Sequence, residues 1–328
     1  MSRQITTVLG PIEAKDLGKT LTHEHLIYGF CGFQGDDTLG PFDELLCIKE
    51  NLKWLVPLKE QYGFKSIIDA TTNECGRDPM FLARMALFTG LNIICSTGYY
   101  YEPFSAFGYW KFRSGFADID EEIYEMMKTE LTKGIRNTGI RAGVIKLASS
   151  KGEITFFEQK FFRAAARINA ELGTSIITHT EAGTMGPEQA ELLIKSGAKP
   201  ANIAIGHMCG NTDVSYHERV LQQGVFDAFD RFGLEGDLFH TPTDAERCDV
   251  IAALMKKGYE DQILMSQDSV TVELGRKRPF PKDDLPEMAN ANILDIPRRV
   301  IGMLKERGVT DAQIEKIFVK NPARFLGD

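Results

Sequence analysis

The sequence has no closely spaced cysteine pair, no block of basic residues and no long apolar run. Its six cysteines are scattered, which is typical of reduced cytosolic thiols and argues against a disulfide framework or a cysteine-rich zinc site. A net charge of −8 argues against a nucleic-acid-binding surface. No apolar run approaches the ~20 residues of a membrane span, and the N-terminus lacks the apolar region of a signal peptide. We therefore expect a cytoplasmic protein that acts on small molecules.

Two histidines, His23 and His25, lie within the apolar stretch from Leu21 to Leu26. Side chains on a strand alternate between two faces, so these imidazoles share one face and Glu24 points the other way. Two imidazoles on a buried face are costly unless something binds them, and neutral imidazole is a common metal ligand. The pattern indicates a metal site, or else two histidines that hydrogen-bond to the backbone. We interpret Glu24 as structural.

Short apolar strands alternate with amphipathic helices along the chain, after a β-hairpin expected within residues 4–18. The predicted strands are 19–25, 66–72, 92–98, 142–149, 175–181, 203–208, 225–231 and 263–268. Helical patterns between them include 43–62, 155–172, 187–197 and 243–258, and a helix near 289–308 follows the last strand. Eight such units predict an α/β protein with a (β/α)8 TIM barrel, formed by residues 1–328 as one domain. An open doubly wound sheet would usually carry a glycine-rich loop after its first strand, where HEHL stands here.

The chemically distinctive residues fall at the carboxyl ends of these strands, where a barrel builds its active site. The candidate ligands are, in chain order, His23, His25, Lys146, His179, His207 and Asp268. The two other histidines, His217 and His240, lie in predicted helix or loop and receive no metal role. Histidines and one carboxylate can hold two divalent ions if an anionic group bridges them.

Lys146 is the candidate for that bridge. Burial favours the neutral amine of a lysine, and a neutral amine can take up CO2 to form a carbamate with two oxygens. Asp268 would ligate one ion and accept a proton from the attacking hydroxide. Two alternatives remain open: Lys146 could form a Schiff base in a lyase, and Asp268 could cap a helix. Cys209 is predicted to line the core rather than bind a metal.

Five segments resemble, in order, the phosphotriesterase family of the amidohydrolase superfamily: GKTLTHEHL, AGVIKLAS, ITHTEAGTMG, IGHM and SQDS. The opening TVLGPIEAKDLG and the ending NPARFLG are also similar, so the resemblance covers essentially the whole chain. It implies a (β/α)8 barrel with two divalent metal ions, usually zinc, with cobalt, manganese or iron as alternatives. Carried over by motif, His23, His25 and Asp268 would hold the more buried ion. His179 and His207 would hold the more exposed one.

Three further residues bear on the expected reaction. The family places a glutamate or a carboxylated lysine at the bridge, and Lys146 agrees with the lysine majority. The segment FDRFG, with Arg231, resembles the Asp-Arg-Tyr-Gly of lactonase-like members, where organophosphate hydrolases tend to have Asp-His. Tyr100 resembles the lactonase tyrosine that approaches the metal-bound oxygen, although an aromatic here could simply line a pocket wall. Asp268, Tyr100 and Arg231 are thus the expected catalytic residues.

The resemblance implies hydrolysis of a lactone or carboxylic ester by a metal-bridging hydroxide, with promiscuous phosphotriesterase activity. An N-acyl amide and a true organophosphate triester are alternatives for the same centre. The segment after Asp268 departs from the lactonase pattern, which puts the leaving group in doubt. Its basic residues, Arg276 to Arg278, could attract an anionic substrate, but we interpret them as a solvated loop face. A homodimer is expected from the resemblance.

Overall fold

The computed structural model describes residues 4–236, 241–278 and 285–327. The first two strands, β1 (Ile5–Thr7) and β2 (Gly10–Ile12), pair antiparallel and confirm the expected hairpin. Gly10 closes their turn with a φ of 117°, a conformation that favours glycine. No helix among the described residues is long and apolar enough to cross a membrane.

A sheet of parallel strands follows the hairpin, and each strand from β3 to β9 pairs with the next along the chain. These strands are β3 (Lys19–Tyr28), β4 (Phe64–Asp69), β5 (Asn92–Gly98), β6 (Val144–Lys146), β7 (Ser175–Ile177), β8 (Ile203–Ile205), β9 (Phe226–Phe229) and β10 (Ile263–Met265). The chain then continues into β11 (Val270–Glu273), which pairs parallel with β3. The Asp268 backbone N–H also donates to the His23 carbonyl at 3.0 Å. These contacts close β3 to β10 into the predicted (β/α)8 barrel.

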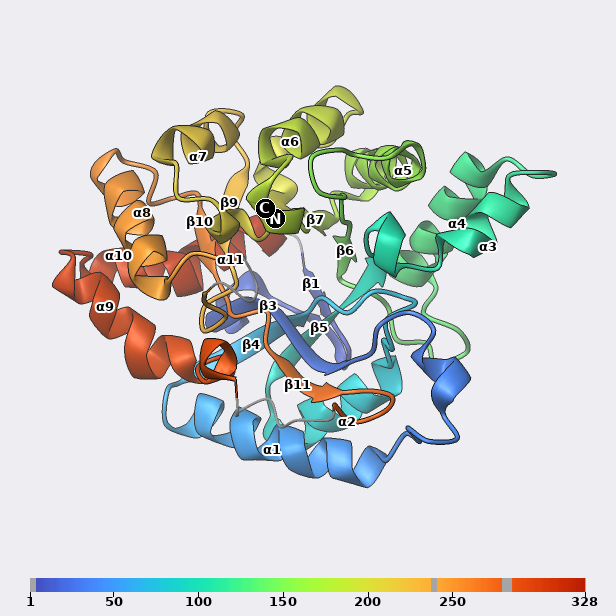
Figure 1. The fold of residues 1–328 in the computed structure, drawn as a ribbon, viewed down its shortest axis with the longest axis horizontal. Coiled ribbons are helices and arrows are strands. Elements are labelled where there is room, and N and C mark those ends of the chain that lie inside the picture. Colours follow the sequence, from blue (N-terminus) through green and yellow to red (C-terminus); the bar gives the residue numbers. More distant parts are fainter. Residues whose placement is uncertain (1–3, 237–240, 279–284, 328) are drawn as a thin grey trace.

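Helices surround the strands in Figure 1. They are α1 (Glu44–Glu60), α2 (Pro79–Thr89), α3 (Phe107–Arg113), α4 (Ile119–Thr132), α5 (Phe156–Leu172), α6 (Gly186–Lys195), α7 (Val214–Leu221), α8 (Asp244–Lys256), α9 (Ile301–Glu306), α10 (Asp311–Glu315) and α11 (Asn321–Gly327). Capping boxes fix the starts of α5 and α8, where Thr155 and Thr243 accept from the backbone three residues on.

Several predicted boundaries differ from the structure by a few residues, and two elements differ most. The helix expected over 289–308 begins at Ile296, because Pro297 is tolerated only in a first helical turn. Its first five residues are π-helical, and α9 continues from Ile301. The strand expected over 142–149 is regular only from Val144 to Lys146, although pairing with the segment after β7 reaches Ser149.

Two apolar clusters occupy opposite faces of the strands. Alternation sends Ile93 on β5 outward to the cluster beneath the helices, whereas its neighbour Ile94 packs in the barrel interior. The interior cluster is capped by Phe325 and Leu326 of α11. The lower part of the barrel is therefore a packed core, and the carboxyl ends of the strands remain for a site.

Candidate metal centre

The six predicted ligands converge at the carboxyl ends of the strands. His23 and His25 belong to β3 and Lys146 is the last residue of β6, while His179 and His207 each lie two residues beyond a strand. Asp268 lies between β10 and β11. All six side chains line one cavity of about 620 Å³. These six residues thus lie together at the strand ends, and their role as metal ligands stays a prediction.

The ligand atoms of His23, His25 and Asp268 lie within 4.8 Å of one another, close enough to share an ion. The Nε2 atoms of His25 and His23 are 3.0 and 3.5 Å from Oδ1 of Asp268. On its other oxygen, Oδ2, Asp268 is 3.6 Å from Nε2 of His207. The Nζ atom of Lys146 is 3.0 Å from Nε2 of His23. This donor set of imidazole, carboxylate and amine suits a borderline divalent ion such as zinc.

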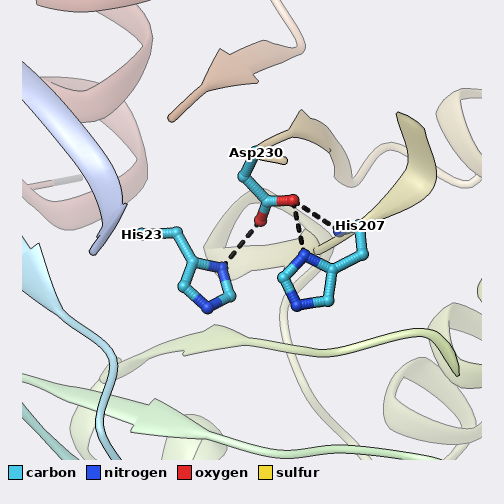
Figure 2. A group of neighbouring side chains, drawn as sticks. All are labelled: His23, His207 and Asp230. Atoms are coloured by element: carbon cyan, nitrogen blue, oxygen red, sulfur yellow. Dashed lines mark hydrogen bonds and ion pairs between the residues drawn. The ribbon is translucent and has the colours of Figure 1, made fainter. Parts of the chain in front are cut away.

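Asp230, at the end of β9, orients two of the histidines and was not predicted as a site residue. Figure 2 shows its carboxylate between His23 and His207. Oδ2 is 2.7 Å from Nδ1 of His23, and Oδ1 is 2.8 Å from Nδ1 of His207. Asp230 lies among candidate metal ligands, but because both oxygens face Nδ1 atoms we interpret it as an orienting group. The Nε2 atoms of the two histidines lie 3.5 and 3.6 Å from the Asp268 carboxylate.

A third imidazole is held in the same way. Nδ1 of His25 is 2.8 Å from Oγ1 of Thr71, a residue of the loop after β4. Metal-binding histidines commonly engage a partner through the second ring nitrogen, which fixes tautomer and orientation. His179 differs, since its Nε2 is 2.9 Å from the Glu181 carboxylate.

Two of the candidate ligands have backbone conformations that favour glycine. His207 has a φ of 58° and Asp268 a φ of 51°. Such strain persists only where the surroundings over-determine it, and it clusters at functional sites. At His207 the backbone N–H donates to Oδ1 of Asp230 at 2.7 Å, so one carboxylate fixes both its backbone and its ring.

Burial sets the protonation states of the centre. It lowers the pKa of Lys146 to about 8 and that of His179 to about 4. Burial also holds the pKa of His207 well below its ordinary value. For Asp268 burial pushes the pKa upward, but His207, neighbouring imidazoles and Arg231 outweigh it, so the pKa lies well below its ordinary value. Neutral imidazoles and an ionised carboxylate are the forms that bind a metal ion.

The two other predicted catalytic residues also line the cavity. Nε of Arg231 donates to Oδ2 of Asp268 at 3.0 Å. The ring of Tyr100 packs edge-on against His179, with 4.9 Å between centroids. Burial keeps the pKa of Tyr100 well above its ordinary value, so the phenol remains a hydrogen-bond donor at neutral pH.

Several alternatives from the sequence are settled by placement. Asp268 caps no helix, because strand β11 follows it. Glu24 is buried and lies outside the cavity lining, as expected for a structural residue. Cys209 packs in the core as predicted. His217 lies on α7 and contacts Asp227, whereas His240 falls outside the described residues.

The basic segment after β11 lies at the cavity, but two of its three charges are paired. Arg276 donates to both oxygens of Asp36, and Arg278 donates to Glu273 at 2.6 Å. Lys277 is exposed and lines the cavity without a partner in the described part of the chain. All three residues are exposed, which is consistent with a solvated loop face, and that interpretation stays a prediction.

A closed parallel barrel with clustered histidines and an aspartate at its carboxyl end defines the class of metal-dependent barrel hydrolases. The chain belongs to the phosphotriesterase family, whose family profile matches residues 3–326. Members of this family are metal-dependent enzymes, so the candidate ligands agree with the family's chemistry.

Three relatives show the range of activities around this chain. A solved structure of a Deinococcus radiodurans PTE-like lactonase variant is 50% identical, covers 98% of this chain and 100% of its own, and has a TM-score of 0.95. The aryldialkylphosphatase of Saccharolobus solfataricus is 35% identical over 318 residues, or 96% of each chain. The N-acetyltaurine hydrolase of Salmo salar is 27% identical over 361 residues, covering 99% of this chain and 98% of its own.

Proposed function

We propose that this hydrolase cleaves a lactone or carboxylic ester with two divalent metal ions bound at the centre, and that it has weak phosphotriesterase activity. The observation that carries the proposal is the convergence of three Nε2 atoms on the Asp268 carboxylate beside a desolvated lysine. In this arrangement His179, His207 and Asp268 already have the protonation states that metal binding requires.

The residues fit two ions with a bridge between them. His23, His25 and Asp268 would hold the more buried ion, and His179 and His207 the more exposed one. Lys146, carboxylated by CO2, would contribute one oxygen to each. Ions bound there would polarise the scissile carbonyl and lower the pKa of water. Zinc is the expected metal, with cobalt, manganese or iron as alternatives.

The surrounding side chains supply proton transfer and orientation. Asp268 is ionised, so its carboxylate can accept the proton that the attacking water gives up. Arg231 fixes Oδ2 of that carboxylate at 3.0 Å and keeps a permanent positive charge beside it. The protonated phenol of Tyr100 would donate a hydrogen bond to the substrate oxygen.

The substrate class is argued from the cavity and from the relatives. Apolar and aromatic side chains line much of the cavity: Tyr28, Phe30, Leu234, Val270, Met288 and Ala291. Such a lining favours an apolar acyl chain or alkyl group. Tyr100 and Arg231 favour a lactone, in keeping with the PTE-like lactonase at 50% identity.

Two other substrate classes have support among the relatives. The aryldialkylphosphatase at 35% identity supports a phosphotriester, and the N-acetyltaurine hydrolase at 27% identity supports an amide. Lys146 as an imine former is disfavoured, because its Nζ is already 3.0 Å from His23 and 3.2 Å from the Thr178 carbonyl. The homodimer and the cytoplasmic location stay predictions, and light scattering tests the first.

The proposal is tested with a substrate panel. Protein loaded with zinc, cobalt or manganese in bicarbonate is assayed on lactones, aryl esters, N-acyl amides and phosphotriesters, and chelator-treated protein is the control. We expect kcat/KM to be highest on a lactone or ester and to vanish with the chelator. A higher kcat/KM on amides or triesters would overturn the substrate class, and full activity in chelator would overturn the metal mechanism.

A further inference from the structure

The buried carboxylate of Glu24 holds the segment that carries Asp268. Glu24 lies on β3 between His23 and His25, and its side chain is completely buried on the face away from the cavity. Ser266 Oγ and the Gln267 backbone N–H donate to Oε1, at 2.6 and 2.9 Å. All of these donors come from the connection between β10 and β11, 242 or more residues away in sequence.

The second oxygen is held on the other side of Asp268. The backbone N–H and the hydroxyl of Ser269 donate to Oε2 of Glu24, at 3.0 and 2.5 Å. In the described chain no lysine, arginine or histidine side chain contacts this carboxylate. These four hydrogen bonds therefore compensate for its burial, and the loss of any one of them would lower the free energy of unfolding.

Backbone contacts join the same segment to the histidine strand. His23 N–H donates to Ser266 Oγ at 2.9 Å, and His25 N–H donates to the Ser269 carbonyl at 3.0 Å. Between these two contacts Asp268 N–H donates to the His23 carbonyl at 3.0 Å. Among the described side chains of β3, Glu24 is the one that accepts hydrogen bonds from residues on both sides of Asp268.

Asp268 itself benefits from such support, because its φ of 51° is a left-handed conformation that costs free energy for a residue other than glycine. Relaxation of this turn would move the carboxylate relative to His23, His25 and Arg231. We propose that Glu24 is a positioning residue for Asp268 in the hydrolytic reaction. The inference rests on the proposed role of Asp268, and it assigns Glu24 no contact with substrate or metal.

Glu24→Gln tests the proposal with little change in shape. A serine hydroxyl can rotate to accept from the new amide NH2, but a backbone N–H cannot. Whichever way the amide turns, either Gln267 N–H or Ser269 N–H loses its acceptor, so one flank of Asp268 is released. We expect kcat to fall about 10- to 100-fold, as is typical when a partner behind a metal ligand is removed, with KM within about twofold.

Glu158 provides a matched control for the structural cost of the change. It too is buried, and its four donors are neutral groups. Its oxygens accept from Ser150 Oγ at 2.7 Å and from the backbone N–H groups of Glu102, Ser150 and Thr155 at 3.0, 3.1 and 2.8 Å. Glu158 ties the loops after β5 and β6 to the start of α5 and lies outside the cavity lining. Glu158→Gln should lower the unfolding temperature comparably and leave kcat within about twofold.

The experiment compares wild type, Glu24→Gln and Glu158→Gln after loading with Co2+, on the ester or lactone that wild type hydrolyses best. Melting temperature, metal content, kcat, KM and the visible absorption spectrum of bound Co2+ are measured. We expect the kcat loss and an altered Co2+ spectrum in Glu24→Gln alone, with metal retained. A native spectrum and kcat in folded Glu24→Gln would overturn the proposal.

If Glu24→Gln does not fold, Ser269→Ala removes one of the four donors and leaves the carboxylate in place. It should lower kcat about tenfold with KM within about twofold. A native kcat in Ser269→Ala would then overturn the proposal. Failure of the proposed function is distinguishable, because wild type itself would hydrolyse no ester or lactone.

Discussion

The two ends of the barrel interior are built from the same strands but hold opposite kinds of side chain. On β6, Val144 belongs to the apolar interior cluster, and Lys146, two residues on, reaches the cavity. On β9 the same step leads from Ala228 to Asp230, which orients two histidines. Side chains two residues apart share a face of a strand. On both strands, therefore, the residue of the apolar core and the residue of the site are only two positions apart.

The two ends also differ in the kind of free energy they contribute. The lower end, below the site, buries a cluster of apolar side chains, so it stabilises the fold by the hydrophobic effect. The upper end, at the carboxyl ends of the strands, buries histidines, a lysine and carboxylates. It also contains two residues with strained backbone conformations, His207 and Asp268. We expect changes at the upper end to affect turnover and changes at the lower end to affect stability.

Lys146→Ala should have the largest effect on turnover. It removes the group that would join both ions, and the stabilisation that bound metal gives a transition state is worth several kcal/mol. We expect kcat to fall by more than about 10³-fold and bound metal to fall with it. Kinetics and elemental analysis measure both, and acetate or propionate should restore part of each. Near-native kcat in this variant would remove Lys146 from the centre.

Asp268→Asn should have the second largest effect. The amide keeps the size of the side chain but cannot accept a proton, and general base catalysis typically contributes about 10²- to 10⁴-fold. We expect kcat to fall at least about 10²-fold while much of the metal is retained. The measurement pairs kcat with metal content on one preparation. Turnover within a few-fold of wild type would show that another group takes the proton.

The pH dependence of the activation of metal-free protein is an independent test of the role of Lys146. Burial lowers the pKa of Lys146 to about 8 in the metal-free protein, so half of the amine is neutral at pH 8 and only about 1% at pH 6. Since only the neutral amine takes up CO2, reactivation of metal-free protein should be about 50-fold slower at pH 6 than at pH 8.

This activation experiment holds dissolved CO2 and metal at fixed concentrations at both pH values. His179 does not interfere, because burial lowers its pKa to about 4 and the imidazole is neutral throughout this range. The rate should rise with CO2 at each pH. Equal rates at pH 6 and pH 8, or rates independent of CO2, would rule out carboxylation as the activating step.

Phe325→Ala should have the smallest effect on turnover and a large effect on stability. The Phe325 ring is buried in the interior cluster, 5.5 Å from the ring of Phe226. Deleting such a ring typically lowers the free energy of unfolding by about 3–5 kcal/mol. We expect that loss in denaturant unfolding, with kcat within about twofold at 25 °C. A tenfold loss of kcat in the folded variant would show that the two ends are coupled.

Much of the upper end could be predicted because strand ends leave a local pattern. The two-residue spacing of the histidines in THEHL places His23 and His25 on one face of a strand. The apolar runs before His179 and His207 indicate where strands end. The barrel followed from counting these units. These features need no knowledge of contacts between distant segments.

The orienting residues could not be predicted in the same way. Asp230 acts on His23 and His207, which lie 207 and 23 residues away in sequence. Glu24 was taken as structural, and its four donors follow more than 240 residues later. Only FDRFG, with an aspartate at a strand end, hinted at Asp230. Such roles depend on which strands become neighbours, and that is a property of the closed barrel.

The most direct test of the central claim is the metal content of the purified protein. The protein is produced with added zinc, cobalt or manganese and bicarbonate, exchanged into metal-free buffer and analysed for its elements. The account predicts about two ions per chain, since two ions are needed for the shared activation of water. A content near zero under every condition would contradict the account and leave Lys146 without its proposed role.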